Sequence, residues 1–261
     1  MNYFVEGVQG AGKSTLVSRL AEHFPDYRVF REGDYNPVEL AWCTYMTEAQ
    51  YEEVLARYES IREEILANTH TEGDRKIVTY TRIITDVPGF HKDLERYEIY
   101  NGRISRAEFE EIILGRFARW SGEQSIFECS MFQNIVENQT LFYEMDDEEI
   151  VAFFLRLKAV LAGRDFRILY LEADDIAGSL QIIRKERVDR NGAEMWFPLM
   201  VGFLEESPHG VRRGLKGFEG LVKHLEHRAA LEKRILSEVF PEQAVILKSK
   251  QYDLNAALAN L

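Results

Sequence analysis

The sequence predicts an α/β fold of three layers, α/β/α, in which helices cover both faces of a mostly parallel sheet. Short apolar runs rich in β-branched and aromatic residues recur along the chain, and longer stretches with helical apolar spacing separate them. No repeat, low-complexity tract or Pro/Gly/Ser-rich linker divides the 261 residues. At 46% hydrophobic content the chain can bury one sizeable core. We therefore expect a single domain with insertions over residues 1–261.

The first strand and the first helix enclose a glycine-rich loop. Tyr3–Val5 is a short apolar run, and Leu16, Val17 and Leu20 recur at helical spacing after the loop. The segment between them, GVQGAGKST, matches the pattern G-x-x-x-x-G-K-[ST] without a gap. That pattern is the phosphate-binding loop, or P-loop, of nucleotide-binding proteins.

Each residue type in the P-loop suits a task in phosphate binding. Glycines let the backbone turn successive N–H groups toward phosphate oxygens, and the following helix directs its positive end to the same place. The Lys13 ammonium can reach the β- and γ-phosphates, and the Ser14 hydroxyl can bind Mg²⁺. We therefore predict a nucleotide site whose residues are Gly7, Gly10, Ala11, Gly12, Lys13, Ser14 and Thr15.

The elements after the P-loop alternate between strands and helices, which favours parallel strands in one sheet. The first helix ends near Phe24-Pro25, because proline cannot continue it. The predicted strands are residues 27–31, 76–84, 125–130, 166–171 and 244–247. One or two helices are predicted between residues 37 and 68, and one after Ser105, with Glu108 completing its capping box. Further helices are predicted on either side of Met145, from Asp174-Asp175 onward, and over residues 218–239.

The net charge and the cysteine content indicate which binding partners and which cellular compartment to expect. A net charge of −12 opposes binding to nucleic acid, so we expect no nucleic-acid partner. Cys43 and Cys129 lack metal-like spacing, which suits a reducing compartment and predicts neither a disulfide framework nor a zinc site. The amino terminus enters a strand directly, and no apolar run reaches the roughly 18 residues of a membrane span. We expect a cytoplasmic protein with no membrane partner.

Three acids, Glu32, Asp34 and Glu128, lie at or near the ends of predicted strands. Glu32 comes after residues 27–31, and Glu128 lies within residues 125–130. Parallel strands deliver their last side chains to the sheet edge where the P-loop also lies. Phosphoryl transfer uses one carboxylate to accept the acceptor hydroxyl's proton and another to hold Mg²⁺. Glu32 and Glu128 are therefore candidates for these two roles. The competing interpretation is that both are ordinary members of 44 acidic residues on a solvated surface.

Four short motifs follow one another along the chain. They are Glu6-Gly7 before the P-loop, Arg31-Glu32 followed by Pro37-Val38 and Trp42, Phe127-Glu128-Cys129-Ser130, and an arginine-rich segment after residues 166–171. Together they resemble the deoxynucleoside kinase and thymidylate kinase-like family of P-loop kinases. The resemblance implies that Glu32 is the base for a nucleoside hydroxyl and that Glu128 helps to bind Mg²⁺. Cys129 stands where the family has an arginine that contacts substrate and phosphate, so the acceptor stays open.

Kinases of this type close an arginine-bearing lid over the transferring phosphoryl group. Arg184 and Arg187 lie at i, i+3 in the run Arg184–Arg190, and we expect them to act from a lid of about residues 184–216. A solvated, charged helix end is the competing interpretation. We expect a surface loop over residues 209–217, and we expect His224 and His227 to be solvated on the polar face of a helix rather than to bind metal.

The acceptor site needs flat or charged side chains that can hold a small molecule. The candidates are Tyr35, Trp42, Tyr45, Tyr80, Arg82 and Phe132. Most aromatic residues at helical spacing belong to a core, which is the competing interpretation for each of them.

The leading functional hypothesis is an ATP- and Mg²⁺-dependent kinase whose partner is a small-molecule acceptor. The acceptor is a nucleoside or nucleotide, or another hydroxyl compound such as an antibiotic. A nucleotide-dependent switch or GTPase is a second hypothesis, because Asp86–Gly89 reads D-x-x-G, although no Asn-Lys-x-Asp element is present. A catalytically inactive binding module is a third, supported by Cys129. A homodimer is left open.

Overall fold

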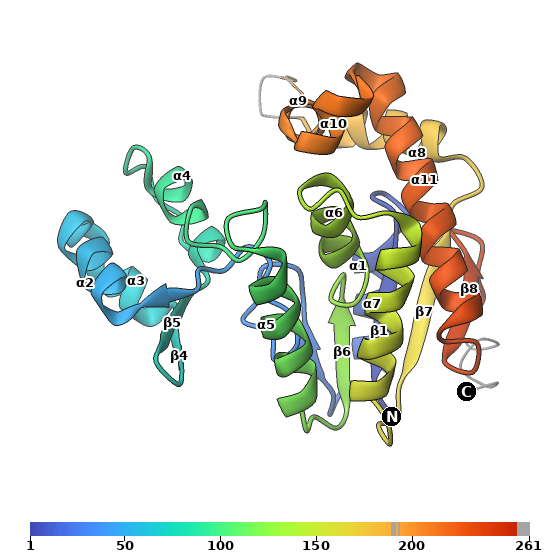
Figure 1. The fold of residues 1–261 in the computed structure, drawn as a ribbon, viewed down its shortest axis with the longest axis horizontal. Coiled ribbons are helices and arrows are strands. Elements are labelled where there is room, and N and C mark those ends of the chain that lie inside the picture. Colours follow the sequence, from blue (N-terminus) through green and yellow to red (C-terminus); the bar gives the residue numbers. More distant parts are fainter. Residues whose placement is uncertain (189–191, 193, 255–261) are drawn as a thin grey trace. The chain divides into compact units, whose positions relative to one another are not determined.

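The computed structural model describes residues 1–188, 192 and 194–254 (Figure 1). The chain forms two compact units, one of residues 1–29 with 122–261 and one of residues 30–121. Each unit has its own hydrophobic core. The expectation of one domain over residues 1–261 stays a prediction.

The first unit is built on a five-stranded parallel sheet with the strand order β2-β6-β1-β7-β8. β1 lies at its centre and pairs in parallel with β6, where Val5 faces Glu128, and with β7, where Gly7 faces Leu171. This result confirms the α/β class and the parallel sheet. The strands are β1 (Tyr3–Gly7), β2 (Arg28–Phe30), β6 (Ser125–Glu128), β7 (Arg167–Glu172) and β8 (Ala244–Lys248).

Alternate residues of β1 point to opposite faces of this sheet, and each face is covered by helices. Val5 packs in one cluster with Leu16 of α1 (Lys13–His23), whereas the Phe4 ring stacks on Phe127 of β6 at a centroid distance of 4.7 Å. The Phe4 side also carries α7 (Asp147–Val160) and α11 (Gly217–Glu238), which lie in front of the sheet in Figure 1. The strand order reverses at β1, and the carboxyl end of a strand at such a point is where ligands bind in open α/β sheets.

The other helices of the first unit are α6 (Gln133–Leu141), α8 (Ile176–Glu186), α9 (Trp196–Glu206) and α10 (Pro208–Arg213). α8 begins where predicted, because the Asp175 carboxylate accepts a 2.8 Å hydrogen bond from the Gly178 amide. The predicted surface loop over residues 209–217 is wrong in its first half. Ser207 caps α10 and Pro208 occupies its first position, a start signal that the following basic residues obscured.

The second unit holds a three-stranded antiparallel sheet of order β3-β5-β4, which the sequence did not lead us to expect. Its strands are β3 (Met46–Thr47), β4 (Thr69–Glu72) and β5 (Arg75–Val78), so the extended prediction for residues 76–84 holds only to Val78. The predicted helical region starts late, at the capping box of Thr47 with Gln50. The helices are α2 (Glu48–Arg57), α3 (Arg62–Ala67), α4 (Phe90–Glu95) and α5 (Arg106–Arg119), with single 3₁₀ turns at Glu59–Ile61 and Tyr80–Arg82.

α5 confirms a purely local prediction. The Ser105 hydroxyl accepts a hydrogen bond from the Glu108 amide, and the Glu108 carboxylate accepts one from the Ser105 amide. Across both units, no helix among the described residues has the length and apolar character needed to span a membrane.

Candidate functional site

The P-loop connects β1 to α1 in a conformation that requires glycine. Gly10 has a φ of +78°, and a Cβ atom there would lie 2.2 Å from the Ile183 Cδ1 atom of α8. Gly12 has a φ of +95° and is the N-cap of α1, so no capping side chain covers the first amides of that helix. The loop therefore presents backbone N–H groups and the positive end of a helix, the combination that binds phosphate.

Lys13 and Ser14 lie where the loop becomes helix. The Lys13 side chain is 8% exposed, and its Nζ atom donates to the carbonyl oxygens of Gly7 at 2.8 Å and Val8 at 3.0 Å. The Ser14 hydroxyl donates a 2.5 Å hydrogen bond to Glu128 Oε1 at the end of β6. The structure thus brings together three of the predicted site residues, Lys13, Ser14 and Glu128.

The contact between Ser14 and Glu128 fits a Mg²⁺ site. Mg²⁺ prefers oxygen ligands and usually takes only one or two from protein, the others coming from phosphate and water. A hydroxyl oxygen and a carboxylate oxygen side by side at the P-loop are such a pair. Among the described residues, no group of three or more His, Cys, Asp or Glu side chains could hold a metal ion. A metal at Ser14 and Glu128 would therefore need further oxygen atoms from a nucleotide.

Glu6 is a fully buried carboxylate directly before the P-loop. It accepts hydrogen bonds from the backbone amides of Met131 at 2.7 Å and Gln133 at 3.3 Å, in the turn that follows β6. Burial raises the pKa of Glu6 to about 7, although the two amides and the charge of Lys13 act in the opposite direction. Glu6 thus ties the strand that leads into the P-loop to the turn that follows Glu128.

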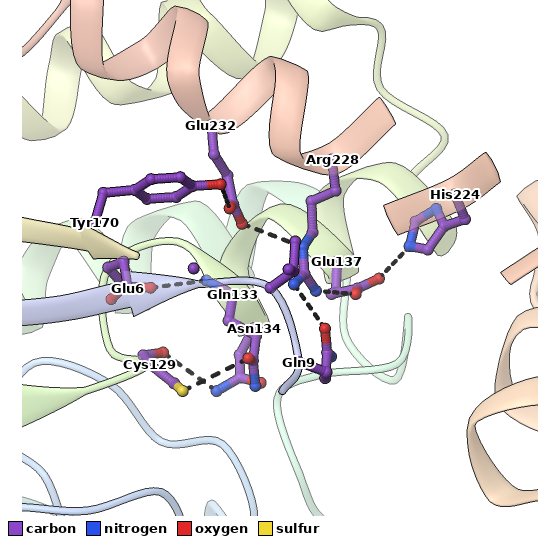
Figure 2. A network of polar contacts seen from close by, with 12 residues as sticks. Glu6, Gln9, Cys129, Gln133, Asn134, Glu137, Tyr170, His224, Arg228 and Glu232 are labelled. Carbon is purple, nitrogen blue, oxygen red and sulfur yellow. Dashed lines mark hydrogen bonds and ion pairs between the residues drawn. The ribbon is translucent and has the colours of Figure 1, made fainter. Parts of the chain in front are cut away.

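A second buried network reaches the P-loop from α11 (Figure 2). Arg228, which is 1% exposed, donates from Nη1 to Glu137 of α6 and from Nη2 to the Gln9 side chain at 2.7 Å. Its Nε atom lies 3.2 Å from Glu232 Oε1. The guanidinium group therefore meets two carboxylates and one P-loop amide side chain.

Two further side chains complete this network. His224 Nε2 lies 2.6 Å from Glu137, and the Tyr170 hydroxyl of β7 donates to Glu232 at 2.9 Å. Burial alone would raise the pKa of Glu137, but His224 and Arg228 outweigh it and hold that pKa at about 2. Burial raises the pKa of Glu232, with Arg228 acting against it. The expectation that His224 is solvated is wrong, because a polar stripe of α11 faces a buried acid that the sequence pattern of α11 alone does not reveal.

Cys129, the departure from the family pattern, is buried at the end of β6. Its φ is +60°, its amide donates to the Val5 carbonyl at 3.1 Å, and its Sγ atom lies 3.5 Å from Gln133 Oε1. The thiol thus belongs to the packed turn beside Glu6.

The predicted lid arginines, Arg184 and Arg187, contact α9 and the residues just before it. Arg184 donates two hydrogen bonds to the Glu194 carboxylate, at 3.0 and 3.1 Å, and lies 4.1 Å from the centroid of the Phe197 ring. Arg187 lies 5.4 Å from the Trp196 ring. Residues 189–191 and 193 of the predicted lid, including Arg190, lie outside the described residues.

Glu32 and most of the predicted acceptor residues belong to the second unit. Glu32 Oε1 accepts a 3.1 Å hydrogen bond from the indole of Trp42, which is 42% exposed. Arg82 forms an ion pair with Asp34. The contact between Glu32 and Trp42 joins the predicted base to a predicted acceptor residue.

The remaining predicted acceptor residues are more enclosed. The Tyr35 ring stacks on His70 at 4.0 Å, and its hydroxyl donates to Glu72 at 2.6 Å. Tyr80 is buried and donates to Glu98. Phe132, in the first unit, is fully buried and its ring centroid lies 5.3 Å from that of Phe154. The Tyr45 ring lies 5.1 Å from the Arg75 guanidinium.

Sequence reasoning did not single out the buried polar groups of the second unit. Burial raises the pKa of Glu39 to about 8 and that of Glu98 to about 7. Arg116 of α5 is 1% exposed and donates to Glu72 and to the Asn36 carbonyl. In the sequence, Glu39, Glu98 and Arg116 are each a single charged residue at an otherwise apolar helical or loop position. Such a pattern indicates burial only weakly.

No model of a known protein family matches the sequence, and no curated protein matches it. The five-stranded parallel sheet flanked by helices is consistent with P-loop kinases without being specific to them.

Replacing Glu137 by Gln should destabilise the protein by about 3–5 kcal/mol at pH 7, because it leaves buried Arg228 and His224 without their shared charged partner. The native pKa of Glu137, about 2, lies below the ordinary 4.5. Its contribution is therefore complete above about pH 4.5 and is lost as the pH falls toward 2. The stability difference between wild type and Glu137→Gln should shrink over that range, measured by urea unfolding at pH 7 and pH 3.

Glu148→Gln is the control, because Glu148 forms an exposed ion pair with Arg234. A loss in Glu148→Gln equal to that in Glu137→Gln, or a difference that does not depend on pH, would contradict the assignment.

Proposed function

We propose that this protein is an ATP-dependent kinase that moves the γ-phosphoryl group to a hydroxyl or phosphate of a small molecule, first of all a nucleoside or nucleotide. The observation that carries the proposal is the contact between Ser14 of the P-loop and Glu128 of the adjacent strand, next to Lys13. A loop that binds only phosphate, without Mg²⁺, does not need the carboxylate of Glu128. An acid paired with the P-loop hydroxyl supports Mg²⁺-dependent chemistry on a nucleoside triphosphate.

The first unit supplies the nucleotide side of the reaction. The amides of the P-loop and Lys13 bind the triphosphate, and Ser14 and Glu128 hold Mg²⁺, which neutralises phosphate charge when bound. Lys13 would exchange its hydrogen bonds to the Gly7 and Val8 carbonyls for bonds to phosphate oxygens. Because hydrogen bonds between two charged groups are stronger than those to neutral carbonyls, the exchange is favourable.

Glu32 supplies the base. It takes the proton from the acceptor hydroxyl while that oxygen bonds to the γ-phosphorus and the bond from the γ-phosphorus to the ADP oxygen breaks. Arg184 and Arg187 steady the charge on the transferring group. Arg184 already binds a carboxylate through two hydrogen bonds, and a phosphoryl group offers the same two-oxygen geometry in exchange.

Exposure separates the candidate residues for acceptor binding. Among Tyr35, Trp42, Tyr80, Arg82 and Phe132, the two most exposed side chains are Trp42 and Arg82, which favours them for contact with a ligand. Phe132 is a core residue beside α7, which favours a packing role. The buried Cys129 supplies neither the charge nor the donors of the family's arginine.

Replacing Glu32 by Gln should lower the turnover number roughly 100- to 10,000-fold, the range for loss of a general base. Turnover of ATP would be measured with a panel of nucleosides, nucleotides, aminoglycosides and macrocyclic alcohols, and the phosphorylated product identified by mass spectrometry. Glu52→Gln, an exposed acid of α2, serves as the control and should match wild type.

An acceptor turned over at the wild-type rate by Glu32→Gln would show that Glu32 is not the base. Tight GTP binding with no phosphorylated product from any acceptor would instead favour a nucleotide-dependent switch.

Replacing Glu128 by Gln should raise the Mg²⁺ concentration for half-maximal turnover roughly tenfold or more, because Ser14 loses its carboxylate partner. The measurement is a Mg²⁺ titration at saturating ATP, with the exposed Glu123→Gln as control. An unchanged Mg²⁺ requirement in Glu128→Gln would remove Glu128 from the metal site.

A further inference from the structure

The strongest unassigned feature of the first unit is the contact between α11 and the P-loop. His224, Arg228 and Glu232 follow one another at intervals of four residues, so they share one face of α11. All three are buried, and Arg228 reaches the P-loop through a hydrogen bond to Gln9 (Figure 2). An apolar helix face would cover the sheet at a lower desolvation cost.

The charge of Arg228 is compensated without Gln9. Glu137 accepts from Nη1, and Glu232 lies 3.2 Å from Nε, so two carboxylates surround the guanidinium group. The third contact, from Nη2 to Gln9 Oε1 at 2.7 Å, adds a neutral acceptor. Its effect is therefore on Gln9 and on the loop that carries Gln9, more than on the charge balance of Arg228.

Gln9 lies in the glycine-rich part of the P-loop. It sits between Gly7 and Gly10, whose φ angles are +137° and +78°. Glycine-rich backbone loses much conformational entropy when it is ordered. A loop that is already ordered when the nucleotide arrives gives tighter binding, because the ordering no longer opposes binding.

We propose that Arg228 is a positioning residue for the P-loop: clamped between Glu137 and Glu232, it holds the Gln9 side chain and so keeps residues 7–12 in the shape that receives nucleotide phosphates. The proposal rests on the proposed function, since it concerns the same nucleotide site. It assigns α11, an element more than 200 residues away in the sequence, to that site.

The test is a double-mutant cycle on the full chain with Gln9→Leu and Arg228→Lys. Gln9→Leu removes the acceptor but leaves the buried ion pairs intact. Arg228→Lys keeps a cation between the two carboxylates but loses the planar fork that reaches Gln9. The readouts are the Kd for a non-hydrolysable ATP analogue with Mg²⁺, by isothermal titration calorimetry, and the Tm. Lys13→Ala reports whether the analogue uses the P-loop, and Arg234→Lys is the control on the exposed side of α11.

We expect each single variant to raise the Kd roughly tenfold, the value of one hydrogen bond to a charged group. The double variant should raise it no further, because both changes remove the same contact. Gln9→Leu should lower the Tm by only a few degrees, because Arg228 Nη2 loses a part-buried acceptor while both carboxylates stay beside the guanidinium group. Arg234→Lys should bind as wild type.

Three outcomes would overturn the proposal. If Lys13→Ala loses binding but Gln9→Leu binds as wild type, the proposal fails while the nucleotide site stands. If the effects of Gln9→Leu and Arg228→Lys add, Gln9 acts by its own contact with the ligand and Arg228 is not its positioner. If wild type binds the analogue no better than Lys13→Ala, the proposed function fails and the proposal fails with it. Should Arg228→Lys not fold, Gln9→Leu alone decides between the first result and the expected one.

Discussion

The parallel pairing of β1 with β6 and β7 brings Glu128 and Tyr170 beside the strand that enters the P-loop. In this register Val5 faces Glu128 and Glu6 faces Tyr170, so the strand that enters the P-loop has an acid on β6 beside it and a tyrosine on β7 opposite its own buried acid. The Cys129 amide extends the pairing by donating to the Val5 carbonyl. A shift of one residue would turn Glu6 toward the α1 face and separate Glu128 from Ser14, because strand side chains alternate.

The first unit buries several charges beneath its P-loop, and each is compensated differently. Glu137 has Arg228 and His224 as direct partners, and they hold its pKa at about 2. Glu6 has backbone amides as its direct partners, and its pKa is raised to about 7. Burying a charge is costly unless the group finds partners, and removing one partner of a buried pair leaves the other charge uncompensated. The arrangement that these buried groups define here is that of β1, α6 and α11 around the loop.

Local signals in the sequence predicted much of the fold. The strand, loop and helix around the P-loop motif, the Ser105 capping box, Asp175 before α8 and the periodicity of α11 each depend on residues close together in the sequence, and each of these structural predictions is confirmed. The antiparallel sheet of the second unit was not predicted, because its strands are only two to four residues long. The buried role of His224 depends on Glu137, 87 residues away, and no single helix pattern contains that information. The contact of Ser14 with Glu128 could be anticipated from where parallel strands end, whereas the contact of Arg228 with Gln9 could not be anticipated from either segment alone.

A crystal structure of the protein with a non-hydrolysable ATP analogue and Mg²⁺ tests the central claim, that the P-loop binds nucleotide phosphates. We expect phosphate oxygens on the amides of residues 7–13, the Lys13 Nζ atom bonded to phosphate instead of the Gly7 and Val8 carbonyls, and Mg²⁺ at the Ser14 hydroxyl. An analogue bound elsewhere, with Lys13 still donating to those two carbonyls, would contradict it.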